Sequence, residues 1–373
     1  MRKLSRRAFV STAATLATGL CTTTLKTSRA STHPDEINWQ DVKDWGVEGK
    51  GFPDTAKFYD RLPANAKGKV RDAVWNLSRH SAGMSVQFKT DATTIHVDHK
   101  VTSANLAMPH MPATGVSGLD LYAKDELGKW RWVSVTRPTA QVMKTTIARN
   151  LNPGFREYRI YLPLYNGTEH LKIGVASNRK FEPIAPRKEK PIVFYGTSIT
   201  HGACASRPGM PHPAILGRRL NRPIINLGFS GNGKLEAAVG EYLVKLKPAV
   251  FVLDCLPNMN SAEVSRRTQP MIAQLRAEHP TVPIVMVEDR TYANSWIIQS
   301  SKNRNQSNRL AFRAAYQTML DDGLEKLFLV NGETLLATDR DDTTDGSHPS
   351  DLGFFNQANA LEPVLRKAMA MKK

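Results

Sequence analysis

The spacing of apolar residues differs between the two halves of the chain. From about residue 35 to residue 177, apolar and polar positions alternate in short runs such as 84–88 and 94–98, and turn residues separate the runs. An alternation with a period of two is typical of strands that bury one face. The same pattern predicts further strands at 119–123, 130–135, 141–147, 158–162 and 171–176. Many short strands with almost no helical segment predict an all-β, jelly-roll-like sandwich over residues 31–177.

The periodicity changes after residue 190. Residues 178–190 contain two prolines and a cluster of charges, and we interpret them as a linker. Beyond them, apolar runs alternate with helical segments such as 235–246, as in a parallel sheet covered on both faces. The predicted strands are 192–195, 224–227, 249–253, 284–287 and 327–330. We therefore expect a three-layer α/β/α, flavodoxin-like domain over 191–373, with its active site beyond the carboxyl ends of five parallel strands.

The first thirty residues have the features of an export signal. Arg6 and Arg7 precede a mild apolar run that ends near Leu20, and Ser28-Arg29-Ala30 has the small-x-small pattern of a cleavage site. The run is too short and too rich in Thr to form a stable membrane span. We interpret residues 1–30 as a twin-arginine signal peptide and expect a periplasmic or secreted protein.

Composition narrows the classes of partner. The 373 residues carry 51 Lys and Arg against 34 Asp and Glu, a formal net charge of +17. Residues 1–30 hold six of the basic residues and no acid, which leaves 45 basic against 34 acidic residues, or +11, in the rest. These charges are scattered, so we expect a solvated basic surface and no nucleic-acid partner. Beyond residue 30 the only cysteines are Cys204 and Cys255, which leaves a single bridge or two free thiols.

Two segments at strand ends carry the residue types of a serine hydrolase. Ser198, in Gly196-Thr197-Ser198, follows the strand at 192–195, where a strand-to-helix turn exposes a hydroxyl at the sheet edge. His348 follows the last strand, and Asp345 lies three residues before it. An imidazole can withdraw the serine proton, and a carboxylate can orient the ring and stabilise its charged form. Either segment alone also fits a plain turn, but together they predict a triad of Ser198, Asp345 and His348.

Two further loops offer donors for a negatively charged oxygen. Gly231 follows the strand at 224–227, and Asn258 follows the strand at 249–253. A glycine N–H, a side-chain amide and the N–H of Ser198 can together stabilise the oxyanion of a tetrahedral intermediate. Glycine and asparagine are also the commonest turn residues, so each loop alone fits ordinary turn chemistry.

Taken together, the four blocks resemble the SGNH, or GDSL-like, hydrolases. The residues that name this family map in order onto Ser198, Gly231, Asn258 and His348, and Asp345 completes the triad. The resemblance covers nearly the whole chain beyond the signal peptide. It implies a serine esterase that forms an acyl-enzyme on Ser198 and needs neither a metal nor another cofactor.

A second motif and two departures refine the resemblance. Residues 118–122, Gly-Leu-Asp-Leu-Tyr, resemble the GxDLY motif of the β-rich domain that precedes the catalytic domain in one branch of these esterases. Thr197 stands where the first block has Asp, and Met259 follows Asn258 where many relatives have Asp. The change at Met259 bears on the shape of the acyl pocket.

Export and the β-rich domain favour a substrate with short acyl groups, above all acetyl, on a carbohydrate. The expected partner is therefore an acylated small molecule or polysaccharide. A thioesterase, a lipase or an acyltransferase would use the same triad, and a non-catalytic carbohydrate-binding protein would use the sandwich alone. These alternatives stay open at the level of sequence.

The remaining candidates carry weaker signals. His201 and His212 lack the spacing of zinc ligands, so we predict no metal site. Glu288-Asp289-Arg290 follows the strand at 284–287 and fits either a wall of the substrate cleft or a surface cluster of ion pairs. Five tryptophans fit either sugar stacking or core packing, namely Trp39, Trp45, Trp75, Trp130 and Trp132.

Overall fold

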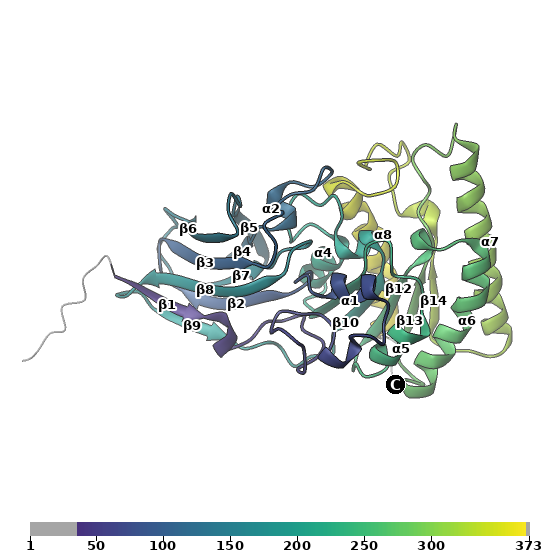
Figure 1. Cartoon of the computed structure of the whole chain (residues 1–373), viewed down its shortest axis with the longest axis horizontal. Helices are drawn as coiled ribbons and strands as arrows, with labels where there is room; N and C mark the ends of the chain where they lie inside the picture. Colours follow the sequence, from purple (N-terminus) through teal and green to yellow (C-terminus); the bar gives the residue numbers. More distant parts are fainter. Residues whose placement is uncertain (1–35, 371–373) are drawn as a thin grey trace, which may run out of the picture.

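The alternating residues of the first half form two antiparallel sheets packed face to face (Figure 1). The computed structural model describes residues 36–370. One sheet has the order β1-β8-β3-β6 and the other β5-β4-β7-β2-β9. The strands are β1 (Ile37–Asp41), β2 (Ser85–Thr90), β3 (Ile95–Val101), β4 (Asp120–Lys124), β5 (Trp130–Val135), β6 (Val142–Ala148), β7 (Arg156–Tyr161), β8 (Thr168–Ala176) and β9 (Phe181–Ile184). The predicted sandwich is confirmed, and β3 shows the expected alternation of buried and half-buried positions.

Two of these strands, β1 and β9, lie outside the predicted set, and β9 falls inside the segment 178–190 that was interpreted as a linker. Phe181 pairs with Thr90 at the edge of the sheet, and its ring stacks on Phe88 at a centroid distance of 5.1 Å. An edge strand tolerates Pro183 and charged residues because one side of its backbone needs no sheet partner. Its composition is therefore that of a loop, and the linker is shorter than predicted.

The second half forms a parallel five-stranded sheet with helices on both faces (Figure 1). Its strands, in the spatial order β11-β10-β12-β13-β14, confirm the flavodoxin-like prediction. They are β10 (Ile192–Gly196), β11 (Ile224–Gly228), β12 (Val250–Asp254), β13 (Ile284–Val287) and β14 (Leu327–Val330). Residues of α5 (Ala237–Leu243), α6 (Ser261–Glu278) and α7 (Gln299–Asp321) pack on one face of the sheet. Residues of α4 (His212–Arg219) and α8 (Asp351–Ala370) pack on the other.

Short helices complete the chain. They are α1 (Asp72–Ser78), α2 (Ala113–Val116) and α3 (Ser198–His201), and the 3-10 helices η1 (Val42–Asp44), η2 (Ala64–Ala66), η3 (Leu256–Asn258) and η4 (Gly332–Thr334). Among residues 36–370, no helix combines the length and the apolar content needed to cross a bilayer. The predicted signal peptide, residues 1–30, lies outside the described residues.

Part of the sandwich half belongs to the core of the α/β half. Phe52, Leu62 and Val74 pack with the apolar side chains beneath α5 and α6, and α1 lies beside the parallel sheet (Figure 1). The turn-rich sequence around these residues has no clear periodicity. The sequence therefore did not predict that they pack against the α/β half. As a result, both halves contribute to the core of the α/β half, while the sandwich has a second core of its own.

Arg61 connects the segment around residues 52–74 to the end of β11 at the edge of the parallel sheet. Its side chain is 2% exposed and donates hydrogen bonds to the carbonyls of Asn226 and Gly228, at 3.1 and 2.8 Å, and to those of Leu77 and His80, at 2.6 and 2.9 Å. Burial lowers the pKa of Arg61 to about 9, so the group stays charged at neutral pH. Both halves of the chain therefore converge at the end of β11, where the loop with Gly231 begins.

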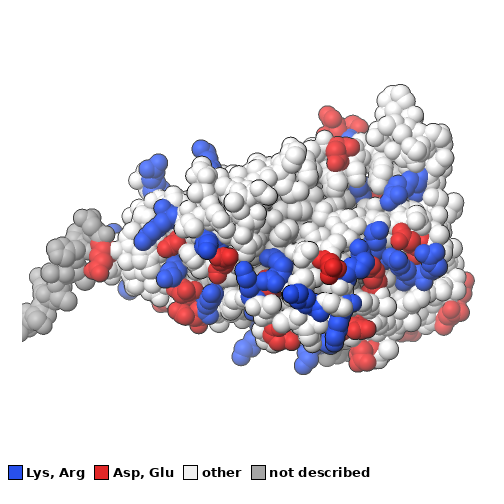
Figure 2. Space-filling view, in the orientation of Figure 1, with Lys and Arg blue, Asp and Glu red and all other residues white. Residues whose placement is uncertain are grey.

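Basic and acidic side chains are mixed on the face of the molecule in Figure 2. Exposed ion pairs of the described residues include Arg131 with Asp125 at 2.8 Å and Arg366 with Glu362 at 2.6 Å. On this face no continuous basic stripe of the kind that follows a phosphate backbone is visible. Cys204 and Cys255 are both buried and free, so of the two alternatives the free thiols are present.

Candidate active site

Ser198, His348 and Asp345 form one chain of hydrogen bonds. The Oγ of Ser198 lies 2.7 Å from Nε2 of His348, and Nδ1 of the same ring lies 2.8 Å from Oδ2 of Asp345. Ser198 is 7% exposed, while the side chains of His348 and Asp345 are 26% and 46% exposed. The structure therefore brings together the three predicted residues, with the nucleophile buried and the imidazole and carboxylate partly exposed. In this arrangement the imidazole can accept the proton of the hydroxyl.

The nucleophile helix begins directly after β10, an inner strand of the sheet. Thr197 caps it, since its Oγ1 accepts a hydrogen bond from the N–H of Ile199 at 3.3 Å. Ser198 is the first residue of α3, so its hydroxyl lies at the carboxyl edge of the sheet. The loop after β11 packs closely on this point, because a Cβ on Gly233 would lie 1.8 Å from the carbonyl oxygen of Gly196. Only glycine fits there.

The carboxylate of Asp345 organises its own loop as well as the imidazole. Its Oδ1 accepts hydrogen bonds from the N–H groups of Ser347 and His348, at 3.0 and 2.7 Å. Partial burial raises the pKa of Asp345, but these bonds and the contact with the His348 ring outweigh burial and hold the pKa below its ordinary value. The group therefore stays ionised at neutral pH and can stabilise a protonated imidazole.

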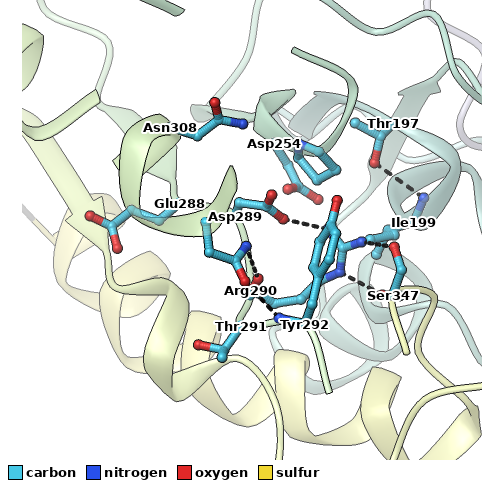
Figure 3. A network of polar contacts seen from close by, with 12 residues as sticks. Thr197, Ile199, Asp254, Glu288, Asp289, Arg290, Thr291, Tyr292, Asn308 and Ser347 are labelled. Atoms are coloured by element: carbon cyan, nitrogen blue, oxygen red, sulfur yellow. Dashed lines mark hydrogen bonds and ion pairs between the residues drawn. The ribbon is translucent and has the colours of Figure 1, made fainter. Parts of the chain in front are cut away.

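Arg290 holds the same loop from inside the protein (Figure 3). It follows β13, is 2% exposed, and donates from Nε to the carbonyl of Ser347 at 2.5 Å and from its second terminal nitrogen to the Ser347 hydroxyl. Its other terminal nitrogen donates to Oδ1 of Asp289 at 2.6 Å. Glu288, Asp289 and Arg290 are all buried, so this segment is not the surface cluster of ion pairs that was one of the two alternatives drawn from the sequence. The only sequence feature that pointed to a role for Arg290 was its place in a charged triplet directly after a buried strand.

Gly231 and Asn258 lie on adjacent loops at the same sheet edge. Gly231 has a positive φ of 67°, and its N–H makes no hydrogen bond to any residue that the structure describes. The side-chain amide of Asn258 donates to the carbonyls of Phe229 and Gly233 at 3.5 and 3.3 Å, which are long contacts. Because Gly233 itself packs on Gly196, both predicted donors lie beside the start of α3.

His201 and His212 serve in packing. His201 stacks on Tyr165 at 4.2 Å, and His212 packs between Phe194 and Phe354. Burial lowers the pKa of His212 to about 3 and that of His201 well below its ordinary value, so both rings are neutral. Within residues 36–370, no three His, Cys, Asp or Glu side chains gather as metal ligands would.

One residue near the triad comes from the sandwich. The ring of His110 lies beside that of His348, with a centroid distance of 6.3 Å and an angle of 32° between the planes. His110 is exposed. No motif marks it, because only the docking of the two halves brings residue 110 to residue 348.

A buried carboxyl lies beneath the nucleophile helix. Asp254 ends β12, is 6% exposed, and accepts a hydrogen bond on Oδ2 from Oγ1 of Thr200 in α3 at 2.9 Å. Burial raises the pKa of Asp254 to about 7, although the bond from Thr200 and the charge of Arg290 oppose this shift. The group therefore carries a proton over the mildly acidic range.

The titration of Asp254 predicts a pH-dependent stability. Its pKa rises from 3.8 to about 7 on folding, so the folded state retains a proton that the unfolded state releases between these values. Its stabilising contribution is complete below pH 4 and is lost as the pH rises to 7. For Asp254→Asn, which does not titrate, we expect the free energy of unfolding relative to wild type to increase over this window, by up to about 1.4 kcal/mol per pH unit. Urea denaturation from pH 4 to 8 measures this, and parallel curves would contradict it.

Two family models match the chain, one in each half. The GDSL-like lipase/acylhydrolase family matches residues 189–366, and the GxDLY model, the N-terminus of SGNH-hydrolase-type esterases, matches residues 37–181. No curated protein matches the chain significantly.

Solved structures share the whole two-part architecture. A Bacteroides ovatus protein assigned as a GDSL-like lipase is 30% identical, with a TM-score of 0.85 over 90% of this chain and 99% of its own. A salicylyl-acyltransferase from a tetracycline biosynthetic pathway is 15% identical, with a TM-score of 0.71 over 90% and 98% of the two chains. A family two carbohydrate esterase from Cellvibrio japonicus is 12% identical, with a TM-score of 0.59 over 90% and 98%. The last two show a likeness of fold alone, but the first, together with the two family models, shows that this chain belongs to the SGNH, or GDSL-like, family of carboxylic ester hydrolases.

Proposed function

We propose that this esterase removes short acyl groups, above all acetyl, from a carbohydrate outside the cytoplasm. The observation that carries the chemistry is the chain of hydrogen bonds from Ser198 through His348 to Asp345, with steps of 2.7 and 2.8 Å. These are the distances at which a base removes a proton from a nucleophile and a carboxylate holds the base in place.

The first half-reaction forms an acyl-enzyme. Nε2 of His348 accepts the proton of Ser198 while Oγ attacks the ester carbonyl carbon, and the carbonyl oxygen becomes the oxyanion. The N–H groups of Ser198 and Gly231 and the amide of Asn258 stabilise that oxygen, and the long contacts of Asn258 with the neighbouring loop after β11 are easily exchanged for it. The intermediate then collapses, the bond to the alcohol oxygen breaks, and His348 donates its proton to the departing alcohol.

The second half-reaction releases the acid. His348 takes a proton from water, the hydroxide attacks the acyl-enzyme carbonyl, and the bond to Ser198 Oγ breaks as the proton returns to that oxygen. No redox partner enters, and atoms and charges balance over the cycle.

The choice of a carbohydrate ester has two supports. The fold is shared with a family two carbohydrate esterase over nearly the full chain, and residues 1–30 resemble a twin-arginine signal that would deliver the enzyme to extracytoplasmic polymers. The likeness of fold to a salicylyl-acyltransferase favours a second candidate, transfer of the acyl group to an alcohol in place of water. Added alcohol acceptors separate the two, since an acyltransferase would form a new ester at the expense of free acid.

Ser198→Ala tests the nucleophile. We expect loss of p-nitrophenyl acetate hydrolysis by about a thousandfold or more, with a nearly unchanged melting temperature, because only the hydroxyl is removed. Ser307→Ala, an exposed serine of α7, is the matched control and should behave as wild type. A folded, fully active Ser198→Ala variant would refute the proposed function.

Asn258→Ala tests the oxyanion donor. We expect kcat to fall on the order of a hundredfold with little change in KM, because the amide acts on charge that develops only in the transition state. Asn258→Asp keeps the shape of the side chain but replaces the donor with an acceptor. It should therefore be no more active than Asn258→Ala. An unchanged kcat in both variants, measured at the same acetyl ester, would remove Asn258 from the oxyanion hole.

Arg290→Lys tests the support of the catalytic loop. Lysine keeps the charge beside Asp289 but cannot donate to both oxygen atoms of Ser347 with fixed geometry. We expect kcat to fall about tenfold or more with KM within twofold, because His348 is displaced from Ser198. Arg313→Lys is the control, since Arg313 pairs with Glu288 and does not reach Ser347. Equal kcat values in the two variants would show that Arg290 has no positioning role.

A further inference from the structure

We propose that His110, which comes from the sandwich, forms the subsite for the alcohol part of the ester and recognises a polyhydroxylated alcohol such as a sugar. The inference rests on the proposed esterase function of the Ser198 site. It assigns to the sandwich a part in substrate selection that no sequence motif indicates.

The position of His110 is fixed by a tight turn. The N–H of Met108 donates to the carbonyl of Met111 at 3.0 Å, and the N–H of Met111 donates back at 2.9 Å, so Pro109 and His110 form the tip. Proline in the first of the two tip positions has the φ that such turns require. Met111 is 2% exposed and anchors the turn in an apolar cluster. The imidazole is therefore exposed at the end of a rigid support.

The helix α2, which follows this turn directly, packs on the segment that follows the nucleophile helix. Oγ1 of Thr114 donates to the carbonyl of Ser206 at 2.6 Å. A Cβ on Gly115 would lie 2.3 Å from the carbonyl oxygen of Ala205, so the two backbones meet in direct contact. The sandwich and α3 are thereby locked together at this point, and His110 keeps its place relative to the triad.

The reaction itself identifies the side on which His110 lies. Because His348 must protonate the departing alcohol, that alcohol occupies the side of Ser198 that faces the His348 ring. His110 is the neighbour of that ring, at a centroid distance of 6.3 Å. Ser198 is hydrogen-bonded to His348 and not to His110, and from its place beside the base His110 can reach substituents of the alcohol. Its two ring nitrogens can donate to and accept from hydroxyl groups.

An exposed aromatic residue belongs to a segment that contacts the loop of His348. Trp296 is 78% exposed, and its segment is tied to the catalytic loop by a hydrogen bond from the N–H of Ala293 to the carbonyl of Gly346 at 2.8 Å. An indole face exposed to water suits the apolar face of a sugar ring. The segment that carries this exposed indole contacts the loop of His348 through Ala293 and Asn294, which agrees with a polyhydroxylated alcohol.

The test compares two substrates that share an acetyl group and differ in the alcohol, p-nitrophenyl acetate and acetylated xylobiose. For His110→Ala we expect KM for acetylated xylobiose to rise about tenfold with kcat within twofold, as for the loss of one hydrogen bond. The loss in kcat/KM for p-nitrophenyl acetate should be several-fold smaller. His110→Gln, whose amide also donates and accepts, should recover part of the affinity.

His170→Ala is the matched control, because His170 is a sandwich histidine that pairs with Asp98. In this variant kcat and KM for both substrates should equal those of the wild type. Equal losses on both substrates, no loss on either, or a wild-type enzyme that hydrolyses p-nitrophenyl acetate but not acetylated xylobiose would each overturn the proposal. Ser198→Ala measured alongside separates the failures: activity in that variant refutes the esterase mechanism itself, whereas its inactivity with an unaltered His110→Ala refutes only the alcohol subsite.

Discussion

The contact between Ser198 and His348 is the constraint on which the rest of the structure depends. The two residues are 150 positions apart, and their 2.7 Å hydrogen bond requires the ends of the α/β half to meet within a few tenths of an ångström. Parallel strands make this possible because all their carboxyl ends lie at one edge, and β10, which leads to Ser198, is an inner strand between β11 and β12. The loops at that edge lack the backbone hydrogen bonds that hold strands in a sheet, so other contacts must fix their position.

Buried polar groups supply that support. Arg290 binds the loop of His348 through two oxygen atoms of Ser347, and Arg61 binds the carbonyls at the end of β11. Asp254 receives the hydroxyl of Thr200 beneath α3 and is neutral below pH 7 because of its burial. Hydrogen bonds in such a dry interior are strong, and leaving any of these groups unpaired would be costly. The geometry of the site is therefore maintained by these buried residues, which lie beneath the triad and are not part of it.

How much of this was visible in the sequence depends on whether the signal is local. The strands β5, β13 and β14 match their predicted bounds because alternation and apolar runs are properties of a few neighbouring residues. Ser198 was found because it directly follows a strand, and Asp345 and His348 because they share a short motif between the last strand and the last helix. Edge strand β9 was taken for a linker, since at a sheet edge proline and charge are tolerated. The roles of Arg61 and His110 depend on contacts more than 130 positions away in the chain, and no local pattern encodes them.

The shared core between the two halves has a consequence for specificity. The α/β half supplies nucleophile, base and oxyanion donors, which act on the acyl group and are the same for any ester. In the proposed mechanism the alcohol lies on the side of His348, where the turn with His110 is closed by its own backbone bonds and anchored by Met111. Residues at the tip of such a turn can change without disturbing the triad, because neither the sheet nor the loop of Asp345 depends on them. Hydrolysis and acyl transfer differ only in whether water or an alcohol attacks the acyl-enzyme from that side. The sandwich is therefore the part of this architecture in which the acceptor can be chosen, while the chemistry below it stays constant.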